Sequence, residues 1–549
     1  MSGRPTFPET FNLADYFLFD RLREGFGSKA AIRFGSHAYT YDDVADRSKR
    51  FEAALRHADV RRGERVLIVL HDVPPFAWAI FGTFARGAVV AMGNPEVPFE
   101  QLRYLLTYTR ATALVTNERI ASELEGAMKA TSFAHELRHV FVVPESETGS
   151  DAERTVRVPS DPRFVALSTA LGVQVGSNHV PEVHRDEPAM WLFTSGSTGE
   201  PKANIHSHRD FAFNTEVYAK RTVGYRESDV TVSVPRLFFG YATGTNLFFP
   251  FAVGGTTCLF SERPTPESVA SAIERYKPTV VTNVPTMIGK LLDHDEALRT
   301  RGEAGLDFST VRFSLSAGEA LPHALLDRWN ERYASDVYDG IGSAEMFHIY
   351  ASNRPGDILP GSLGKVVDGY ELRVLPEDAD GPGATPCGSG EIGVLWVRGD
   401  SVSHGYWLDR DRSFKTFHGH WCKTGDLFHV DEEGYLYFAG RADDLLKVGG
   451  QWVAPTEVEN CLHAHPAVAC AAMIGVEQEG LTKTKAFVVL RSGFAPSESL
   501  ASELQEHVRA RLSKYKYPRM VEFLDEMPKN DRGKVDKKAL RVRETQEGM

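Results

Sequence analysis

The stretch Trp191–Lys202, Trp-Leu-Phe-Thr-Ser-Gly-Ser-Thr-Gly-Glu-Pro-Lys, constrains this chain more than any other. Its apolar beginning runs into hydroxyls and glycines, which predicts a buried strand that ends in a loop with little side-chain bulk. Glycines let main-chain N–H groups turn toward an anion, hydroxyls add donors and a lysine adds positive charge. The residues in question are Thr194, Ser195, Gly196, Ser197, Thr198, Gly199 and Lys202. The spacing is not that of a Walker loop. A Ser/Gly linker, the alternative, seldom follows a strand and closes with Pro-Lys, so we predict a phosphate-binding loop.

The composition is that of a globular protein. The chain has 549 residues, of which 42% are hydrophobic and 25% charged, and this length indicates one large multi-lobed domain and at least one smaller one. A net charge of −12 argues against nucleic-acid and membrane partners. Proline and arginine interrupt the apolar region Val66–Met92, and the N-terminus has no signal-peptide core, so no membrane span is expected. Five cysteines without a Cys-x-x-Cys pair indicate reduced thiols in a cytoplasmic protein.

Strands and helices alternate from His37 to Thr116. Thr40 is predicted to cap a helix together with Asp43, and Pro74 to open another. Continuous apolar runs predict buried strands at Val66–Leu70, Ala88–Met92 and Ala113–Thr116. This alternation predicts an α/β fold with parallel sheets.

The last part of the chain changes character. Alternating patterns at Glu391–Val397 and Tyr435–Phe438 predict a small antiparallel β subdomain. From Thr456 onward, helices and strands predict a separate α+β unit of about a hundred residues. We therefore predict a large N-terminal domain, residues 1–440, of parallel α/β sheets plus the β subdomain. A smaller, mobile C-terminal domain, residues 441–549, would follow a junction at Gly440–Asp443.

Several other motifs carry polar residues at the ends of predicted strands. Phe313–Ala320 places Ala317, Gly318 and Glu319 where ligands of parallel α/β folds bind. Asp339-Gly-Ile-Gly-Ser-Ala-Glu345 ends in a carboxylate, for which a magnesium ligand and a surface glutamate are equally good interpretations from the residues alone. The motif Lys423-Thr-Gly-Asp places Asp426 after a predicted tight turn. From the residues alone, a carboxylate that accepts the ribose hydroxyls and an ordinary structural residue are equally good interpretations of Asp426.

Three further segments favour ordinary structure when they are considered alone. The segment Pro235–Gly244 is rich in aromatic residues and predicts an apolar loop followed by the start of a helix. His206 and His208 are interpreted as polar helix-entry residues in preference to metal ligands. The basic run Pro528–Lys534 is typical of a solvated charged loop.

Taken together and in order, these motifs resemble the adenylate-forming superfamily of acyl- and aryl-CoA synthetases, peptide-synthetase adenylation domains and firefly-type luciferases. The resemblance implies ATP, Mg²⁺ and coenzyme A as substrates and cofactor. It implies catalytic roles for Thr194, Glu345 and Lys534, with Glu345 as the Mg²⁺ ligand. It extends the ATP/AMP site beyond the phosphate loop to Gly318, Glu319, Ala320, Asp339, Gly340, Asp426, Arg441 and Lys534. It also implies a hinge at Asp443 and a CoA channel at Gly449, Gly450 and Gln451.

Within this superfamily, Arg236-Leu-Phe-Phe, Tyr338-Asp-Gly-Ile-Gly and Glu345–Asp357 resemble the benzoate-CoA ligase branch. That likeness implies an aryl pocket of Phe238, Tyr241, Ala242, Ala317, Ile341, Gly342 and His348. A structural histidine is an equal interpretation of His348. Two positions depart from the usual pattern: Ala344 stands where most relatives carry Thr, which removes one donor worth about 1 kcal/mol, and Ala203 stands where Gly is usual.

These features predict an enzyme that activates a small aromatic acid to an aryl-AMP and transfers the aryl group to CoA. The acid is expected to be benzoate or a hydroxy- or aminobenzoate, with 2-aminobenzoate (anthranilate) among the candidates. A free-standing enzyme that loads a carrier protein supplied in trans is the alternative. A degenerate adenylate-binding protein is the alternative from another class, because of Ala344. The resemblance allows a monomer or a homodimer.

Overall fold

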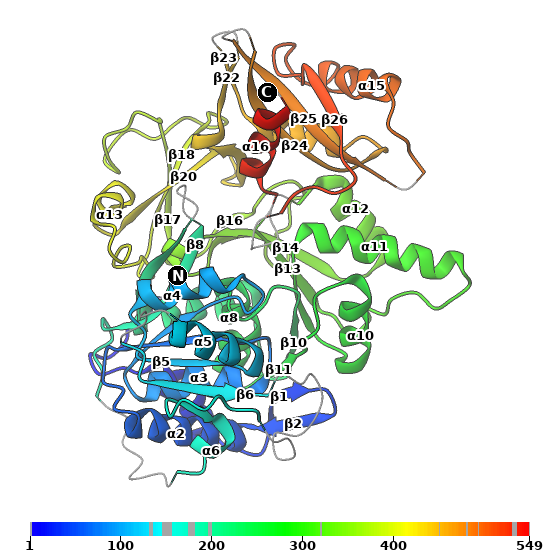
Figure 1. Cartoon of the computed structure of the whole chain (residues 1–549). Helices are drawn as coiled ribbons and strands as arrows, with labels where there is room; N and C mark the ends of the chain where they lie inside the picture. The colour runs from blue at the N-terminus through cyan, green and yellow to red at the C-terminus, as the bar shows by residue number, and fades with distance from the viewer. Residues whose placement is uncertain are drawn as a thin grey trace.

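The computed structural model describes residues 3–130, 136–144, 156–173, 182–195, 200–318, 321–448, 451–478, 481–491, 493–529 and 535–547. In Figure 1 the blue, cyan and green parts of the chain form the lower lobes, and the yellow β subdomain lies above them on the left. The orange and red C-terminal residues form a separate unit at the top.

Sheet A contains the strand that precedes the predicted phosphate loop. Its strand order is β7-β6-β5-β3-β4-β8-β9. The bounds are β3 Arg65–Val69, β4 Val89–Met92, β5 Ala113–Asn117, β6 His139–Val143, β7 Phe164–Ala166, β8 Pro188–Ser195 and β9 Pro201–Ser207. Neighbouring strands are parallel except for β8 and β9, which form an antiparallel hairpin. The predicted alternation of buried strands and helices is confirmed here.

Two helices show how local signals build this lobe. α2 (Tyr41–His57) begins with the predicted capping box of Thr40 and Asp43. α3 (Pro74–Ala85) begins at the predicted proline, and all of its residues are buried. The two helices cross closely, because a Cβ on Gly82 would lie 2.7 Å from the Ser48 carbonyl oxygen. The other helices described between residues 3 and 173 are η1 Asp15–Phe19, α1 Asp20–Arg23, α4 Phe99–Thr109, α5 Glu118–Ala130 and α6 Leu167–Ala170.

Sheet B has the strand order β16-β15-β14-β13-β12-β10-β11-β1-β2. The bounds are β1 Ala30–Phe34, β2 His37–Thr40, β10 Val230–Ser233, β11 Thr256–Leu259, β12 Val280–Asn283, β13 Phe313–Ala317, β14 Asp336–Gly342, β15 Ile349–Ser352 and β16 Lys365–Val366. The strands from β1 through β11, β10, β12 and β13 to β14 are parallel, and β2, β15 and β16 are antiparallel additions.

Both faces of sheet B are covered, so its central strands β11, β12 and β13 are buried along their whole length. One face packs against α10 (Pro266–Tyr276), α11 (Pro285–Thr300) and α12 (His323–Arg332). The other face shares a large apolar core with sheet A. Helical segments contribute to that core, namely α7 His208–Asn214, η2 Thr215–Val223, α8 Gly240–Thr243, η3 Gly244–Phe248 and α9 Phe249–Ala252.

The predicted β subdomain is present, with one correction. Its strand order is β17-β18-β20-β19, and β21 pairs with β20. The bounds are β17 Glu371–Leu375, β18 Gly393–Arg398, β19 Phe417–His418, β20 Trp421–Val430, β21 Leu436–Arg441 and α13 Arg410–Thr416. The prediction of a tight turn before Asp426 is wrong, because the whole segment lies within β20. A shift in the register of β18 against β20 and a φ of +75° at Gly425 mark an irregularity at this point.

The C-terminal unit has its own apolar cores. β22 (Leu446–Val448) pairs with β23 (Gln451–Val453), and β24 (Val468–Gln478), β25 (Leu481–Leu490) and β26 (Met520–Phe523) form a sheet. Its helices are α14 Pro455–His463, α15 Glu498–Arg509 and α16 Lys537–Glu547. The predicted α/β fold with a smaller α+β unit is confirmed. The boundary after residue 440 stays a prediction; β21 ends at Arg441, and the turn η5 (Ala442–Asp444) follows.

Two expectations from composition can be compared with the described residues. Cys258, Cys387, Cys422, Cys461 and Cys470 are free thiols. Among the helices of the described ranges, none combines the length and apolar character needed to cross a bilayer.

Gly364 and Gly356 both have positive φ angles, +70° and +74°, but differ in their surroundings. A Cβ on Gly364 would lie 2.0 Å from the Ser352 carbonyl carbon, whereas Gly356 has nothing within 4 Å. We expect Gly364→Ala to prevent stable folding of the N-terminal domain, because backbone atoms cannot yield. Gly356→Ala should cost only about 1 kcal/mol, the strain of a left-handed alanine. Urea unfolding followed by tryptophan fluorescence measures both, and equal losses would contradict this assignment.

Candidate functional site

The β8–β9 hairpin carries the predicted phosphate loop between its strands. Thr194 pairs with Lys202 and Ser195 with Pro201. Gly196, Ser197, Thr198 and Gly199 lie outside the described residues, as does the side chain of Ser195. The Lys202 ammonium lies 5.9 Å from the centre of the Tyr406 ring, within cation–π range. The hairpin therefore places a lysine opposite Thr194 and next to an aromatic ring that the sequence analysis did not single out.

The carboxyl ends of β13 and β14 bring together predicted nucleotide residues. Parallel pairing sets Ser316 against Asp339 and Ala317 against Gly340. Gly318 follows β13 with a φ of +95°, which glycine tolerates and other residues rarely adopt. Glu319 and Ala320 lie outside the described residues. Main-chain pairing thus joins two of the predicted segments at one sheet edge, where α/β folds bind ligands.

Asp339 is a buried carboxyl group at this edge, with 4% of its surface exposed. Burial raises its pKa from 3.8 to about 8, and the neighbouring polar groups of Ser316, Leu321 and Gly340 only partly oppose this rise. The group is therefore largely protonated at neutral pH. In that form it can donate as well as accept a hydrogen bond.

Glu345 lies in a short turn, η4 (Ala344–Met346), just after β14. The Tyr406 hydroxyl donates a hydrogen bond of 2.9 Å to Glu345 Oε1. The Ser403 main-chain N–H donates to the Glu345 carbonyl oxygen at 2.8 Å. The carboxylate is therefore held from the segment that follows β18 rather than being free on the surface, which distinguishes it from an ordinary surface glutamate.

His206, which the sequence analysis interpreted as a helix-entry residue, contacts the same turn. Ser207 does cap α7, with Asp210 closing the capping box. However, His206 itself is fully buried, and its Nδ1 lies 2.9 Å from Asp210 Oδ2. Its Nε2 donates to the Ala344 carbonyl oxygen at 2.6 Å, because a carbonyl can only accept. Within the described ranges, no group of three or more His, Cys, Asp or Glu side chains is arranged to hold a metal by itself.

The predicted aryl-pocket residues Tyr241 and His348 are neighbours. Their ring centres are 5.3 Å apart, and His348 Nε2 donates to the Tyr241 carbonyl oxygen at 3.0 Å. A Cβ on Gly244 would lie 2.6 Å from the His348 ring, and one on Gly342 would lie 2.5 Å from the His348 carbonyl oxygen. Glycines are therefore required for the chain to close around this histidine.

The remaining predicted pocket residues lie in α8, in the loop before it and in β13 and β14. Ala242 is fully buried in α8, and Ala317 ends β13. Ile341 pairs with Ala351 across β14 and β15. Phe238 packs on Phe239 at 4.4 Å between ring centres, in the loop before α8. This loop and the ends of β13 and β14 thus belong to one apolar core.

A buried ion pair supports the loop that carries Phe238. Asp72 Oδ1 accepts the Leu237 main-chain N–H at 2.9 Å, and Asp72 Oδ2 lies 3.7 Å from Arg236 Nη1. The guanidinium also donates to the Phe260 carbonyl oxygen at 2.6 Å and lies over the Phe260 ring. Sequence reasoning missed Asp72, since it is separated from Leu237 by 165 positions.

Asp426 and Arg441 are brought together in the β subdomain. They face each other across β20 and β21, and Arg441 Nη1 lies 3.0 Å from Asp426 Oδ1. Their predicted ribose role stays a prediction. Lys534, Gly449 and Gly450 lie outside the described residues, as do the side chains of Asp443 and Gln451.

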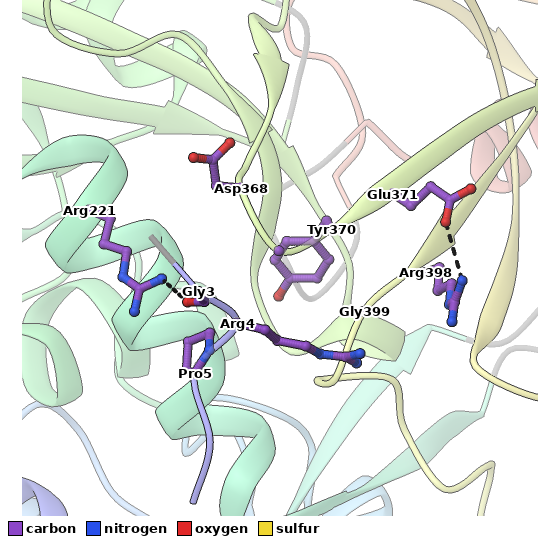
Figure 2. Close-up of a pocket in the computed structure, with 10 residues that line it drawn as sticks. Gly3, Arg4, Pro5, Arg221, Asp368, Tyr370, Glu371, Arg398 and Gly399 are labelled. Atoms are coloured by element: carbon purple, nitrogen blue, oxygen red, sulfur yellow. Dashed lines mark hydrogen bonds and ion pairs between the residues drawn. The ribbon is translucent and has the colours of Figure 1, made fainter. Parts of the chain in front are cut away.

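A separate surface cavity of about 300 Å³ lies beside the N-terminal segment (Figure 2). Its arginines are engaged within the protein: Arg4 pairs with Asp400, Arg398 lies 3.3 Å from Glu371, and Arg221 donates to the Gly3 carbonyl oxygen. The predicted site residues are not among the described residues that line it. We therefore do not assign the nucleotide to this cavity.

Comparison with known proteins defines the class. Residues 19–407 match the family model "AMP-binding enzyme", and residues 457–534 match the model "AMP-binding enzyme C-terminal domain". The chain belongs to the AMP-binding enzyme family. The predicted resemblance is confirmed.

Its similarity to individual members extends over nearly the whole chain. It is 37% identical to a benzoate–CoA ligase of Thauera aromatica, covering 97% of this chain and 96% of that one. It is 32% identical to an anthranilate–CoA ligase of Pseudomonas aeruginosa, covering 88% and 87%. The crystal structure of an anthranilate CoA ligase in complex with anthranoyl-AMP superposes with a TM-score of 0.89 at 34% identity, over 99% of both chains. A benzoate CoA ligase from Burkholderia xenovorans gives 0.84 at 34%, over 97% and 100%.

The buried Asp339 makes a prediction about pH and stability. Between pH 3.8 and about 8 the folded chain keeps a proton that the unfolded chain has lost, so its unfolding free energy falls as pH rises. His208, His348 and His463, whose pKa values burial lowers to about 4, act in the opposite direction below pH 6.5. We therefore expect Asp339→Asn to flatten the decline in stability between pH 6.5 and 8.

Urea unfolding at several pH values measures this effect. Asp380→Asn, at an exposed residue outside helices and strands, is the control and should leave the slope unchanged. A slope in Asp339→Asn equal to that of the wild type would refute the assignment.

Proposed function

We propose that this chain is an ATP-dependent aryl-CoA ligase that converts benzoate or a hydroxy- or aminobenzoate to its CoA thioester through an aryl adenylate. The observation that carries the proposal is the similarity, over almost the full length of both chains, to benzoate–CoA and anthranilate–CoA ligases. The likeness to a structure that holds an aryl adenylate supports the same intermediate.

The first step attaches AMP to the acid, because a carboxylate would otherwise have to expel oxide. A carboxylate oxygen attacks the α-phosphorus of ATP, and pyrophosphate leaves with the electron pair of the broken P–O bond. Charge builds up on the phosphate oxygens, so donors and cations must already be in position. We assign this role to Thr194, the loop that follows it, Lys202 and Lys534.

The donor set around Glu345 fits Mg²⁺, which prefers carboxylate and phosphate oxygens to nitrogen and sulfur. Tyr406 occupies one hydrogen-bonding position on Oε1, which leaves other lone pairs of the carboxylate for a cation. When bound there, the ion would supply charge stabilisation at the phosphates of ATP. Asp426 and Arg441 are proposed to hold the ribose.

The second step transfers the aryl group. The CoA thiol loses its proton, its sulfur attacks the mixed anhydride, a C–S bond forms, and AMP leaves. We propose that the C-terminal domain turns about Asp443 between the two steps, so that Gly449, Gly450 and Gln451 line the path of the pantetheine arm.

The aryl pocket favours a substituent that can donate a hydrogen bond. His348 Nε2 carries its proton toward the Tyr241 carbonyl, and burial lowers the His348 pKa to about 4, so the ring is neutral at neutral pH. Its Nδ1 is then an acceptor, and both Nδ1 and the Tyr241 hydroxyl are buried with no partner in the described structure. An amino or hydroxyl group on the substrate ring would satisfy them, which benzoate cannot do.

This interpretation predicts an ordering of substrates. Pyrophosphate release should be faster with amino- or hydroxybenzoates than with benzoate and much slower with octanoate. Tyr241→Phe should lower the kcat/KM ratio of the substituted acid to benzoate about 10-fold, the value of one hydrogen bond. Each acid is assayed with and without CoA. An unchanged ratio would contradict the pocket assignment, and release without thioester formation would favour a carrier protein as acceptor.

Lys534→Ala tests the division between the two steps. We expect it to abolish pyrophosphate release, because a cation at the α-phosphate is lost, and to leave thioester formation from supplied aryl-AMP largely intact. Single-turnover assays of the two half-reactions measure this. Equal loss of both steps would remove the assigned role. Lys529→Ala, in the same segment, is the matched control.

A further inference from the structure

We propose that Tyr406 and His206 are positioning residues that hold Glu345 ready for a divalent cation, Tyr406 through the carboxylate and His206 through the preceding carbonyl. The inference rests on the proposed function, because it presumes that Glu345 meets a cation together with ATP. Neither residue was expected to have this role from the sequence.

Tyr406 is anchored independently of Glu345. Its main-chain N–H donates to Ser413 Oγ at 2.9 Å, and its ring contacts the Phe417 ring at 5.4 Å between centres. Its main chain also bridges to Asn204 of β9. The Tyr406 hydroxyl donates to Glu345 Oε1 at 2.9 Å from this anchored position. A fixed donor therefore sets the orientation of the carboxylate.

His206 fixes the main chain one residue earlier. Its ring is fully buried, and it is oriented at Nδ1 by Asp210, which also accepts from the Ser207 main-chain N–H at 3.0 Å and from Ser207 Oγ at 2.5 Å. The acceptor on the other side is the carbonyl oxygen of Ala344, whose own side chain has no polar group. The turn at this residue is therefore anchored through its backbone.

The turn is held from several directions and carries strain. Phe347, two residues after Glu345, has a φ of +68°, which is rare for a residue other than glycine, and its ring packs on Phe211 at 4.4 Å between centres. Such a conformation persists only where the surroundings enforce it, and strained residues of this kind gather at functional sites. The side chain of Glu345 is thus placed before any ligand arrives.

Positioning groups around a metal ligand typically change metal affinity 10- to 100-fold when they are removed. The test is calorimetric titration of ATP with excess magnesium chloride and again with EDTA, without acid or CoA, so that no turnover contributes. We expect the wild type to bind ATP more tightly with magnesium. The magnesium-dependent gain is the factor by which magnesium increases the affinity for ATP. In Tyr406→Phe this gain should fall about 10-fold or more, whereas the affinity for ATP in EDTA should stay unchanged.

Tyr437→Phe is the matched control, because the Tyr437 hydroxyl also donates to a carboxylate, Asp431 at 3.1 Å, in the β subdomain. It should leave both titrations unchanged. For His206, two substitutions separate a positioning role at Nε2 from a merely structural role. His206→Gln places its amide donor where Nε2 stands and should retain the magnesium-dependent gain. His206→Asn places its amide nearer Nδ1 and should lose the gain about 10-fold.

The outcomes separate this inference from the proposed function. A wild type that binds ATP equally with and without magnesium would overturn both the metal role of Glu345 and the inference. A magnesium-dependent wild type with an unaffected Tyr406→Phe would overturn the inference alone. Two results would show that His206 is only a structural residue and would overturn the inference for His206. One is an equal loss of the magnesium-dependent gain in His206→Gln and His206→Asn. The other is a loss of ATP affinity in EDTA as large as the loss in magnesium.

Discussion

The register of β13 against β14 is the constraint on which the candidate site depends. Main-chain hydrogen bonds set Ala317 beside Gly340 and Ser316 beside Asp339, and parallel neighbours end at the same sheet edge. β14 then turns back into antiparallel β15, so Glu345 and His348 fall in the short connection between them. Main-chain pairing of three consecutive strands, β13, β14 and β15, thereby places the proposed nucleotide, metal and aryl residues of this region before any side chain makes a contact.

Side chains from distant segments then tie this connection to the rest of the large domain. His206 reaches it from β9 of sheet A, and Tyr406 reaches it from the segment after β18. Lys202 lies next to the same tyrosine ring. The hairpin that carries the predicted phosphate loop and the turn that carries Glu345 therefore share their supports. A displacement of one would be transmitted to the other, which suits the proposed function, in which phosphate donors and a metal ligand act on one substrate.

Several buried polar atoms near the candidate site have no hydrogen-bond partner, as do others elsewhere in the described structure. Asp339 is buried and largely protonated at neutral pH, and the Tyr241 hydroxyl and His348 Nδ1 have no partner in the described structure. Elsewhere buried charges are compensated, as where Arg312 and Asp229 pair at 2.7 Å. Unpaired polar atoms cost free energy in an empty protein, and a bound ligand recovers that cost. The Asp339, Tyr241 and His348 groups lie in β14, in α8 and just after β14, where the substrate is proposed to bind.

The sequence by itself determined what depends on neighbours along the chain. The capping box of Thr40 and Asp43, the start of α3 at Pro74 and the buried strands followed from periodicity and capping, which are local. Tertiary structure alone decided that Asp426 lies inside an irregular strand, since that depends on the partner strand β18. It also decided that His206 holds Ala344 across 138 positions and Tyr406 holds Glu345 across 61. Such contacts arise from the register and packing of distant segments, for which a linear pattern has no signal.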